Sequence, residues 1–194
     1  MAKMLQERVC APEEIRVLDL GCGTGSQVEL LDRMGFNAIG LDLSAAMLAH
    51  AKKKAHKRGA AGFELVMADA FNLPFASSAF DAVTIQLVLH EMDREIMLGV
   101  LQEMKRVARE DALFLVIDFV GPTVFNPITC LIRMAEFSAG LRHYRNSRDF
   151  VRAGGLPYWL GKTGFRISDC FPYFFGCVHL AVAHSLAPHL SGRR

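Results

Sequence analysis

The sequence predicts an α/β fold, in which helices flank a seven-stranded, mostly parallel sheet and a helical insertion precedes the last two strands. Short apolar runs rich in β-branched and aromatic residues alternate with segments of helical periodicity, which is the pattern of repeated strand–helix–strand units. The chain has 194 residues, of which 52% are hydrophobic. That is enough to bury one large core, so we expect a single domain over residues 1–194.

The first part of the chain is divided by glycines and by a capping serine. The expected elements are strands at 15–20, 37–43 and 63–69 and helices at 26–34 and 44–58. Gly35 and Gly59 are placed to end the two helices, because glycine is favoured just past a helix end. Ser44 has the side chain of a helix N-cap.

The later part of the chain continues the alternation of strands and helices and then departs from it. The expected elements are strands at 80–89 and 112–120, a helix from Asp93 to Arg109, and two final strands within 164–194. Between them, Asn126-Pro127 fits a helix start. An apolar face follows at helical spacing, made of Ile128, Leu131, Ile132, Ala135 and Ala139. Residues 121–163 are therefore predicted to form a helical insertion.

Composition excludes several classes of protein. The 22 basic and 20 acidic side chains give a formal charge of +2, which argues against a general nucleic-acid surface. The five cysteines are widely separated and show no zinc spacing, so we expect a reduced, cytoplasmic chain without a metal site. Residues 1–14 lack the apolar core of a secretion signal. The late apolar run 174–187 contains two histidines and fits a buried strand better than a membrane span.

Glycines and acidic residues gather where the predicted strands end. Gly21, Gly23 and Gly25 follow the first strand, Asp42 closes the second, and Asp69 closes the third. In open α/β sheets, ligands bind beyond the carboxyl ends of the strands. Glycines let a ligand approach the backbone, and a carboxylate after the second strand suits the ribose hydroxyls of a dinucleotide or an adenosyl cofactor.

The charge of the glycine loop favours the adenosyl cofactor. Asp19 lies just before the first glycine, where a carboxylate would repel a pyrophosphate and attract an ammonium or a sulfonium. The glycines also read GxGxG and not the GxGxxG of a pyrophosphate loop.

Four segments carry a family resemblance: VLDLGCGTG (17–25), GLDLS (40–44), MADAFNLPFASSAFDAV (67–83) and LHEMD (89–93). With these motifs, the sequence resembles the class I S-adenosylmethionine-dependent methyltransferases, and among them the small-molecule enzymes similar to the ubiquinone/menaquinone-biosynthesis methyltransferases. The resemblance covers about residues 15–120. It implies a Rossmann-like fold, S-adenosylmethionine as cofactor and S-adenosylhomocysteine as product.

The resemblance also implies a set of cofactor-binding residues. The two glycines would contact the methionine end beside the loop aspartate, and Asp42 would hold the ribose hydroxyls. The two apolar side chains after Asp42 would line the adenine ring, the 69–70 pair would meet its edge, and Gln86 would approach the methionyl part. The full set is Asp19, Gly21, Gly23, Asp42, Leu43, Met47, Asp69, Ala70 and Gln86.

The chain departs from its relatives at both ends of this core. Many relatives carry a longer N-terminal helical segment that closes over the cofactor, whereas about fourteen residues precede the first strand here. We expect a lid that is short, missing, or supplied by a second subunit of a homodimer. Substrate recognition in the family usually involves the region after residue 120. The chain is thus divided into a short segment (1–14), a cofactor-binding core (15–120), a substrate-side insertion (121–163) and the last strands (164–194).

Two features outside the cofactor loop admit two interpretations each. His90 could take a proton from the acceptor, since its ordinary pKa is near neutrality, or it could order the turn after the fourth strand. Arg142, Arg145, Arg148 and Arg152 could form one helix face for an anionic substrate group or a membrane surface. Alternatively, that face is solvated or ion-paired, or is interrupted at Asn146-Ser147.

The leading hypothesis is a methyltransferase for a small, apolar or amphipathic acceptor, such as a quinol, a phenol, an amine or a lipid-like molecule. The chain lacks a DPPY-like motif, a glutamate pair near the fourth strand and a Pro-Cys pair, which argues against nucleic-acid and protein-arginine methylation. Two alternatives remain: a module that binds S-adenosylmethionine or S-adenosylhomocysteine without efficient catalysis, and a nicotinamide-dependent oxidoreductase.

Overall fold

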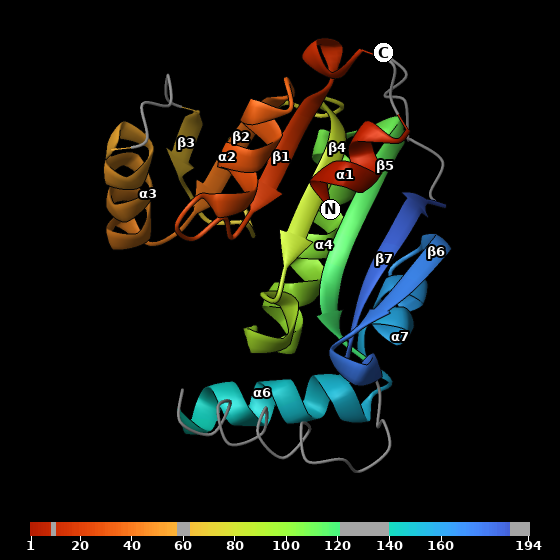
Figure 1. Ribbon diagram of the computed structural model, residues 1–194. Helices are drawn as coiled ribbons and strands as arrows, with labels where there is room; N and C mark the ends of the chain where they lie inside the picture. The colour runs from red at the N-terminus through yellow and green to blue at the C-terminus, as the bar shows by residue number, and fades with distance from the viewer. Residues whose placement is uncertain (9–10, 58–62, 121–139, 187–194) are drawn as a thin grey trace, which may run out of the picture.

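A computed structural model describes residues 1–8, 11–57, 63–120 and 140–186 (Figure 1). Its seven-stranded sheet has the order β3-β2-β1-β4-β5-β7-β6. The strands are β1 Arg16–Leu20, β2 Asn37–Asp42, β3 Glu64–Met67, β4 Phe80–Gln86, β5 Ala108–Phe119, β6 Phe165–Tyr173 and β7 Val178–Ser185. The first five strands pair in parallel, and β7 pairs antiparallel with both β5 and β6. The predicted mostly parallel sheet is confirmed.

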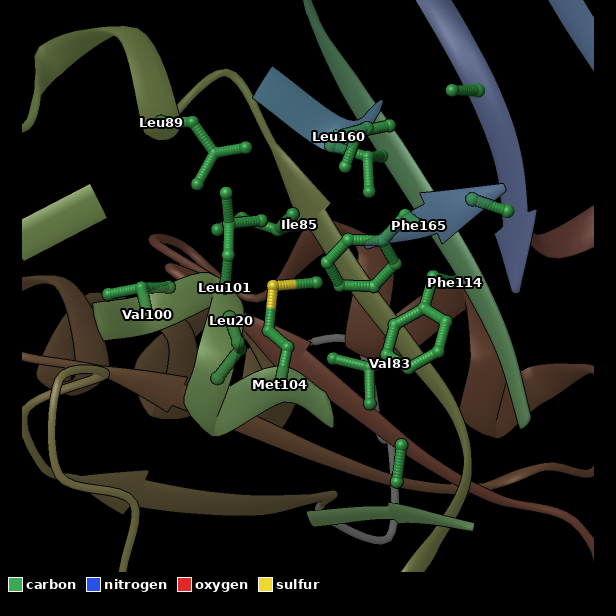
Figure 2. Close-up of a cluster of buried hydrophobic side chains, with 14 of the residues drawn as sticks. Leu20, Val83, Ile85, Leu89, Val100, Leu101, Met104, Phe114, Leu160 and Phe165 are labelled. Carbon is green, nitrogen blue, oxygen red and sulfur yellow. The ribbon is translucent and has the colours of Figure 1, made fainter. Parts of the chain in front are cut away.

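Helices cover both faces of this sheet. They are α1 Ala2–Gln6, α2 Ser26–Arg33, α3 Ala45–Lys57, α4 Arg94–Val107, α6 Leu141–Arg152 and α7 Gly155–Lys162, with short 3-10 turns η1 Pro12–Glu14, η2 Leu89–Glu91 and η3 Phe174–Gly176. One apolar core joins α4 and α7 to the sheet, and Figure 2 shows part of it around Leu101, Met104 and Phe114. A second core joins α1, α2 and α3 to the opposite face.

The strand order reverses between β1 and β4. From β1 the chain builds outward to β2 and β3, and it then returns to place β4 and β5 on the other side. The loops after β1 and β4 therefore flank the switch point, where ligands of open α/β sheets bind. Helix α6 lies across this carboxyl edge, below the ends of β4 and β5 (Figure 1).

Several predicted boundaries are confirmed, and three are corrected. Ser44 caps α3, because its Oγ accepts the Met47 backbone N–H at 3.3 Å. Strand β4 ends at Gln86 and not at residue 89, because Leu87 has a left-handed φ of 54° and turns the chain into η2. Strand β3 ends at Met67, so Asp69 lies beyond the strand in a turn. Strand β5 starts at residue 108, directly after α4.

The region before the last two strands is helical where the structure describes it. Helix α6 runs through Asn146 and Ser147, so the predicted interruption there is wrong. The Asn146 side chain donates to the Glu91 carbonyl at 2.9 Å and to the Asp93 carboxylate at 3.0 Å, and Ser147 is buried. These contacts outweigh the weak helix propensity of both residues. The apolar face predicted at 128–139 lies outside the described residues.

None of the helices in the described ranges combines the length and the apolar character needed to cross a bilayer. The apolar run predicted to be a buried strand forms β7, which lies between β5 and β6, only from Val178 on. Its first residues form η3, where Phe174 and Phe175 are exposed, so the prediction is wrong there.

Candidate functional site

The three glycines of the loop after β1 have left-handed φ angles of 63°, 53° and 70°, but their surroundings differ. A Cβ on Gly25 would meet Phe63 and Ala51, and one on Gly21 would lie 2.7 Å from Val88 Cγ2. These two glycines allow neighbouring segments to pack against the loop. A Cβ on Gly23 would meet no atom of the described residues within 4 Å. Gly23 is thus the point of the loop where a ligand can approach the backbone.

Asp42 ties this loop to the end of β2. Its Oδ2 accepts the Gly23 backbone N–H at 2.8 Å, and its Oδ1 accepts the Ser44 backbone N–H at 2.8 Å. The side chain is half-buried, so it keeps access to solvent beside the half-buried Gly23. The pair therefore places a carboxylate next to open backbone, and its role in holding hydroxyl groups remains a prediction.

Asp19 is only 3% exposed and accepts the Thr84 hydroxyl hydrogen at 2.5 Å. Burial raises its pKa to about 7; the Thr84 hydrogen bond opposes this shift, and repulsion from Asp42 adds to it. The Asp19 side chain is therefore buried directly before the glycine loop, and its charge changes with pH near neutrality.

Cys22 in the same loop is also buried, and its backbone N–H donates to the Leu41 carbonyl at 3.0 Å. Burial, followed by repulsion from Asp19 and Asp42, raises the pKa of the thiol to about 12. A thiol held protonated in this way is unreactive, so Cys22 serves as a small side chain in a tight turn.

The remaining predicted cofactor residues lie at the rim of the same edge. Leu43, just before α3, and Met47, in its first turn, are 70% and 46% exposed. The exposed Asp69 accepts the Phe71 backbone N–H at 2.9 Å, and Ala70 packs on the core. Gln86 is exposed at the last position of β4. The structure brings these positions to one edge of the sheet, and their roles toward a cofactor remain predictions.

His90 belongs to a buried histidine–aspartate pair. The imidazole is 3% exposed, and its Nδ1 lies 2.7 Å from Oδ1 of Asp118, which is fully buried in β5. The Asp118 carboxylate also accepts the backbone N–H groups of Leu89 at 3.0 Å and of Phe119 at 2.7 Å. Sequence reasoning missed Asp118, although an acidic residue inside the apolar run ALFLVIDFV was a usable signal.

Helix α6 is anchored on the turn that carries His90. The carboxylate of Asp93 pairs with Arg142, and hydrogen bonds from Arg142 and Asn146 lower its pKa. The His143 ring lies 5.6 Å from the His90 ring, nearly perpendicular to it. Two arginines of the predicted face are ion-paired: Arg142 with Asp93, and Arg148 with Asp149 at 3.5 Å. The other two, Arg145 and Arg152, are exposed.

A cavity of about 270 Å³ opens between η2, α4, α6 and α7. Its lining includes Met92, Met97, Phe150, Tyr158 and Trp159. Three aromatic side chains, Phe150, Tyr158 and Trp159, thus line this cavity. Phe150 and Trp159 also belong to the core, at 4% and 5% exposure, so their rings have both roles.

A family model described as a methyltransferase domain matches residues 18–116. The chain is 34% identical over 125 residues to a demethylmenaquinone methyltransferase of Renibacterium salmoninarum, covering 64% of this chain and 49% of that one. A demethylmenaquinone methyltransferase of Geobacillus kaustophilus is 33% identical over 177 residues, covering 83% and 75%. The match thus spans about half the length of the first relative and three quarters of the second.

Solved structures share the fold. A SAM-dependent methyltransferase from Aquifex aeolicus aligns with a TM-score of 0.64 at 20% identity, covering 94% of this chain and 89% of that one. A magnesium protoporphyrin IX methyltransferase from Synechocystis, solved with bound SAH, aligns with a TM-score of 0.69 at 23% identity, covering 95% and 80%. At these identities the likeness concerns the fold alone.

Proposed function

Because the chain belongs to the methyltransferase domain family, of the class I S-adenosylmethionine-dependent type, we propose that it transfers the methyl group of S-adenosylmethionine to a small, apolar or amphipathic acceptor. One observation carries this proposal. The open backbone at Gly23 adjoins the Asp42 carboxylate at the switch point of the sheet. A ribose and a methionyl group need this combination of close backbone approach and acceptor oxygens.

The residues of this edge fit the cofactor in shape and charge. The Asp42 oxygens would accept the ribose hydroxyls, and Leu43 and Met47 would lose contact with water against the adenine ring. Asp69, Ala70 and Gln86 would complete the rim. Asp42, with Asp19 when ionised, makes the loop electronegative, which favours a sulfonium over a pyrophosphate. The sulfonium supplies an activated methyl group, so the protein's task is to orient the acceptor and exclude water.

His90 is proposed as the proton acceptor where the methylated atom must lose a proton. Asp118 holds the Nδ1 side of the ring at 2.7 Å, which fixes the tautomer and leaves Nε2 as the basic nitrogen. The same contacts order the turn after β4. Both interpretations of His90 are thus supported by one arrangement, and kinetics must separate them.

The surroundings support an apolar acceptor. The cavity beside η2 presents Met92, Phe150 and Trp159 together with the charged Arg94 and Asp149, a mixed lining that suits an amphipathic acceptor as well. The turn between β6 and β7 exposes Tyr173, Phe174 and Phe175, at 47%, 66% and 82%. Exposed aromatic rings favour the interface of a bilayer, so we include peripheral membrane contact as a route to an acceptor dissolved in lipid. The homodimer remains a prediction.

Ligand binding and turnover separate the candidate functions. Calorimetry with S-adenosylmethionine and with NAD tests the cofactor, and binding of NAD alone would overturn the methyltransferase proposal in favour of the oxidoreductase. Release of S-adenosylhomocysteine from quinol, phenol, amine or lipid acceptors tests the activity. Binding without turnover on any of these acceptors would favour the binding module.

Asp42→Ala tests the site directly. We expect it to weaken binding of S-adenosylmethionine by about 1–3 kcal/mol, the scale of losing charge-assisted hydrogen bonds, as measured by calorimetry. Asp32→Ala, which removes an exposed carboxylate from α2, is the control and should bind normally. Unchanged affinity in Asp42→Ala would remove Asp42 from the site.

A further inference from the structure

Three potential metal ligands converge where α6 meets the turn after β4. His90 and Glu91 come from η2, and His143 comes from the first turn of α6. One ligand atom from each of them lies within 4.8 Å of the others, and His143 Nδ1 is 4.0 Å from Glu91 Oε1. Sequence spacing could not indicate this group, because His143 is distant along the chain and arrives only when α6 docks.

The deepest of these ligands is already oriented. Asp118 engages Nδ1 of His90, so Nε2 is the nitrogen that would coordinate an ion. A histidine held through its other nitrogen by a buried carboxylate is the usual arrangement behind a metal ligand, because the carboxylate fixes the ring and raises its basicity. Exposure increases outward, with side-chain values of 3% for His90, 18% for His143 and 51% for Glu91, so the group is open to solvent on one side.

We propose that His90, Glu91 and His143 bind a divalent transition-metal ion of the zinc type and leave one coordination position open. Two imidazoles and one carboxylate form a donor set found in open zinc sites, whereas Mg²⁺ and Ca²⁺ prefer oxygen ligands. The charges of Glu91 and the nearby Asp118 balance a doubly charged ion. Zinc ligands at about 2.0–2.2 Å in a tetrahedral site lie roughly 3.4 Å from one another. The ligand atoms, which lie within 4.8 Å of one another, must therefore move closer together, and the half-exposed Glu91 has the freedom to move.

The role of this ion in activating the acceptor rests on the proposed function, whereas binding of the ion does not. Nε2 of His90 cannot hold a proton and an ion at the same time, so in the ion-bound state the ion replaces His90 in activating the acceptor. A hydroxyl or phenol bound at the open position would release its proton to solvent and keep a lone pair on oxygen to attack the methyl group, whereas an amine bound there would have none left. The substrate class is therefore an acceptor with a hydroxyl or phenolic oxygen, in preference to an amine.

The test is zinc calorimetry on the full chain, stripped of metal with a chelator and free of S-adenosylmethionine. We expect one ion per chain at this site, and we expect His143→Ala to lower the affinity at least about tenfold. Asp118→Asn should lower it about 10–100-fold. His56→Ala, an exposed histidine on α3, is the matched control and should bind normally. If Asp118→Asn fails to fold, the zinc affinity of His143→Ala still tests the proposal, because His143 is partly exposed.

Cys170 and His179 form a competing pair, since Sγ and Nδ1 are 3.1 Å apart. Cys170→Ser should therefore retain the ion, and cobalt bound in place of zinc should show no thiolate charge-transfer absorption. Absence of binding, loss of binding in Cys170→Ser, or normal affinity in His143→Ala would each overturn the proposal. Asp42→Ala should bind zinc normally while binding S-adenosylmethionine more weakly, so a failure of either proposal is seen separately.

Discussion

Asp19 couples the stability of the protein to pH. Its pKa rises from 3.8 to about 7 on folding, so between about pH 4 and pH 7 the folded state keeps a proton that the unfolded state has lost. Stability is therefore greatest below the unfolded pKa and falls as pH rises, by about 1.4 kcal/mol per unit and up to about 4 kcal/mol in all, before levelling off. Denaturant unfolding across this range should show the slope in the natural chain and lose it in Asp19→Asn. An equal slope in both chains would contradict the assignment.

Substitution of Gly23 tests whether a glycine is needed at this position for ligand binding or only for the turn. Gly23→Ala places a Cβ at φ 53° with no described atom within 4 Å. We expect a loss of roughly 1–2 kcal/mol in stability from strain alone. The Cβ also projects into the space of the proposed cofactor, so calorimetry should show at least about tenfold weaker binding of S-adenosylmethionine.

Gly176→Ala is the matched control for Gly23→Ala. Gly176 has φ 83° in the turn before β7, and a Cβ there also meets no described atom within 4 Å. It should lose similar stability and keep normal cofactor affinity. Equal affinity in the two variants would mean that Gly23 serves the turn alone.

Single residues at the site were predictable to different degrees. Gly21, Gly23 and Asp42 could be placed because a strand, a turn and a strand end fix them locally. Asp118 and His143 could not, because their roles depend on β5 lying beside η2 and on α6 docking there. A motif records local geometry, whereas these contacts arise from tertiary packing.

At the scale of elements, α2 approaches the sheet closely over Gly40 of β2. A Cβ at this position would lie 2.7 Å from Val28 Cγ2 and 2.9 Å from both Cys22 Sγ and Leu65 Cδ2. Gly40→Ala should therefore force the glycine loop, α2 and β3 apart and cost about 1–3 kcal/mol of unfolding free energy, as measured by denaturant unfolding. Gly161→Ala in α7 meets no described atom and should be neutral or stabilising by up to about 1 kcal/mol. Matching losses in both variants would contradict this packing argument.

Periodicity predicted the existence and order of the described elements better than their ends. Apolar runs predict the strands, because both faces of this sheet pack against an apolar core. Ends depend on single dihedral angles such as φ 54° at Leu87, which no side-chain pattern encodes. The continuity of α6 through Asn146 likewise depends on acceptors in η2 that a linear pattern does not reveal.

The whole molecule brings the two proposed sites to one edge of the sheet, with the cofactor loop after β1 and the histidine group after β4. The first is held by a loop and the second by η2 and α6, whereas the strands and α4 carry much of the large apolar core. A ligand that binds only the folded chain should raise the free energy of unfolding of the whole chain. At one hundred times its dissociation constant, S-adenosylhomocysteine should add about 2.7 kcal/mol to the unfolding free energy.

For a chain of this size, that gain corresponds to a rise of about 5–11 °C in Tm, which a thermal melt at increasing ligand concentration would measure. NAD should leave the Tm unchanged, and Asp42→Ala should need more S-adenosylhomocysteine for the same shift, because mass action depends on affinity. If NAD gave the larger shift, the site would be one for dinucleotides. If neither ligand moved the Tm, the open backbone at Gly23 would not be a cofactor site, whatever the likeness in fold.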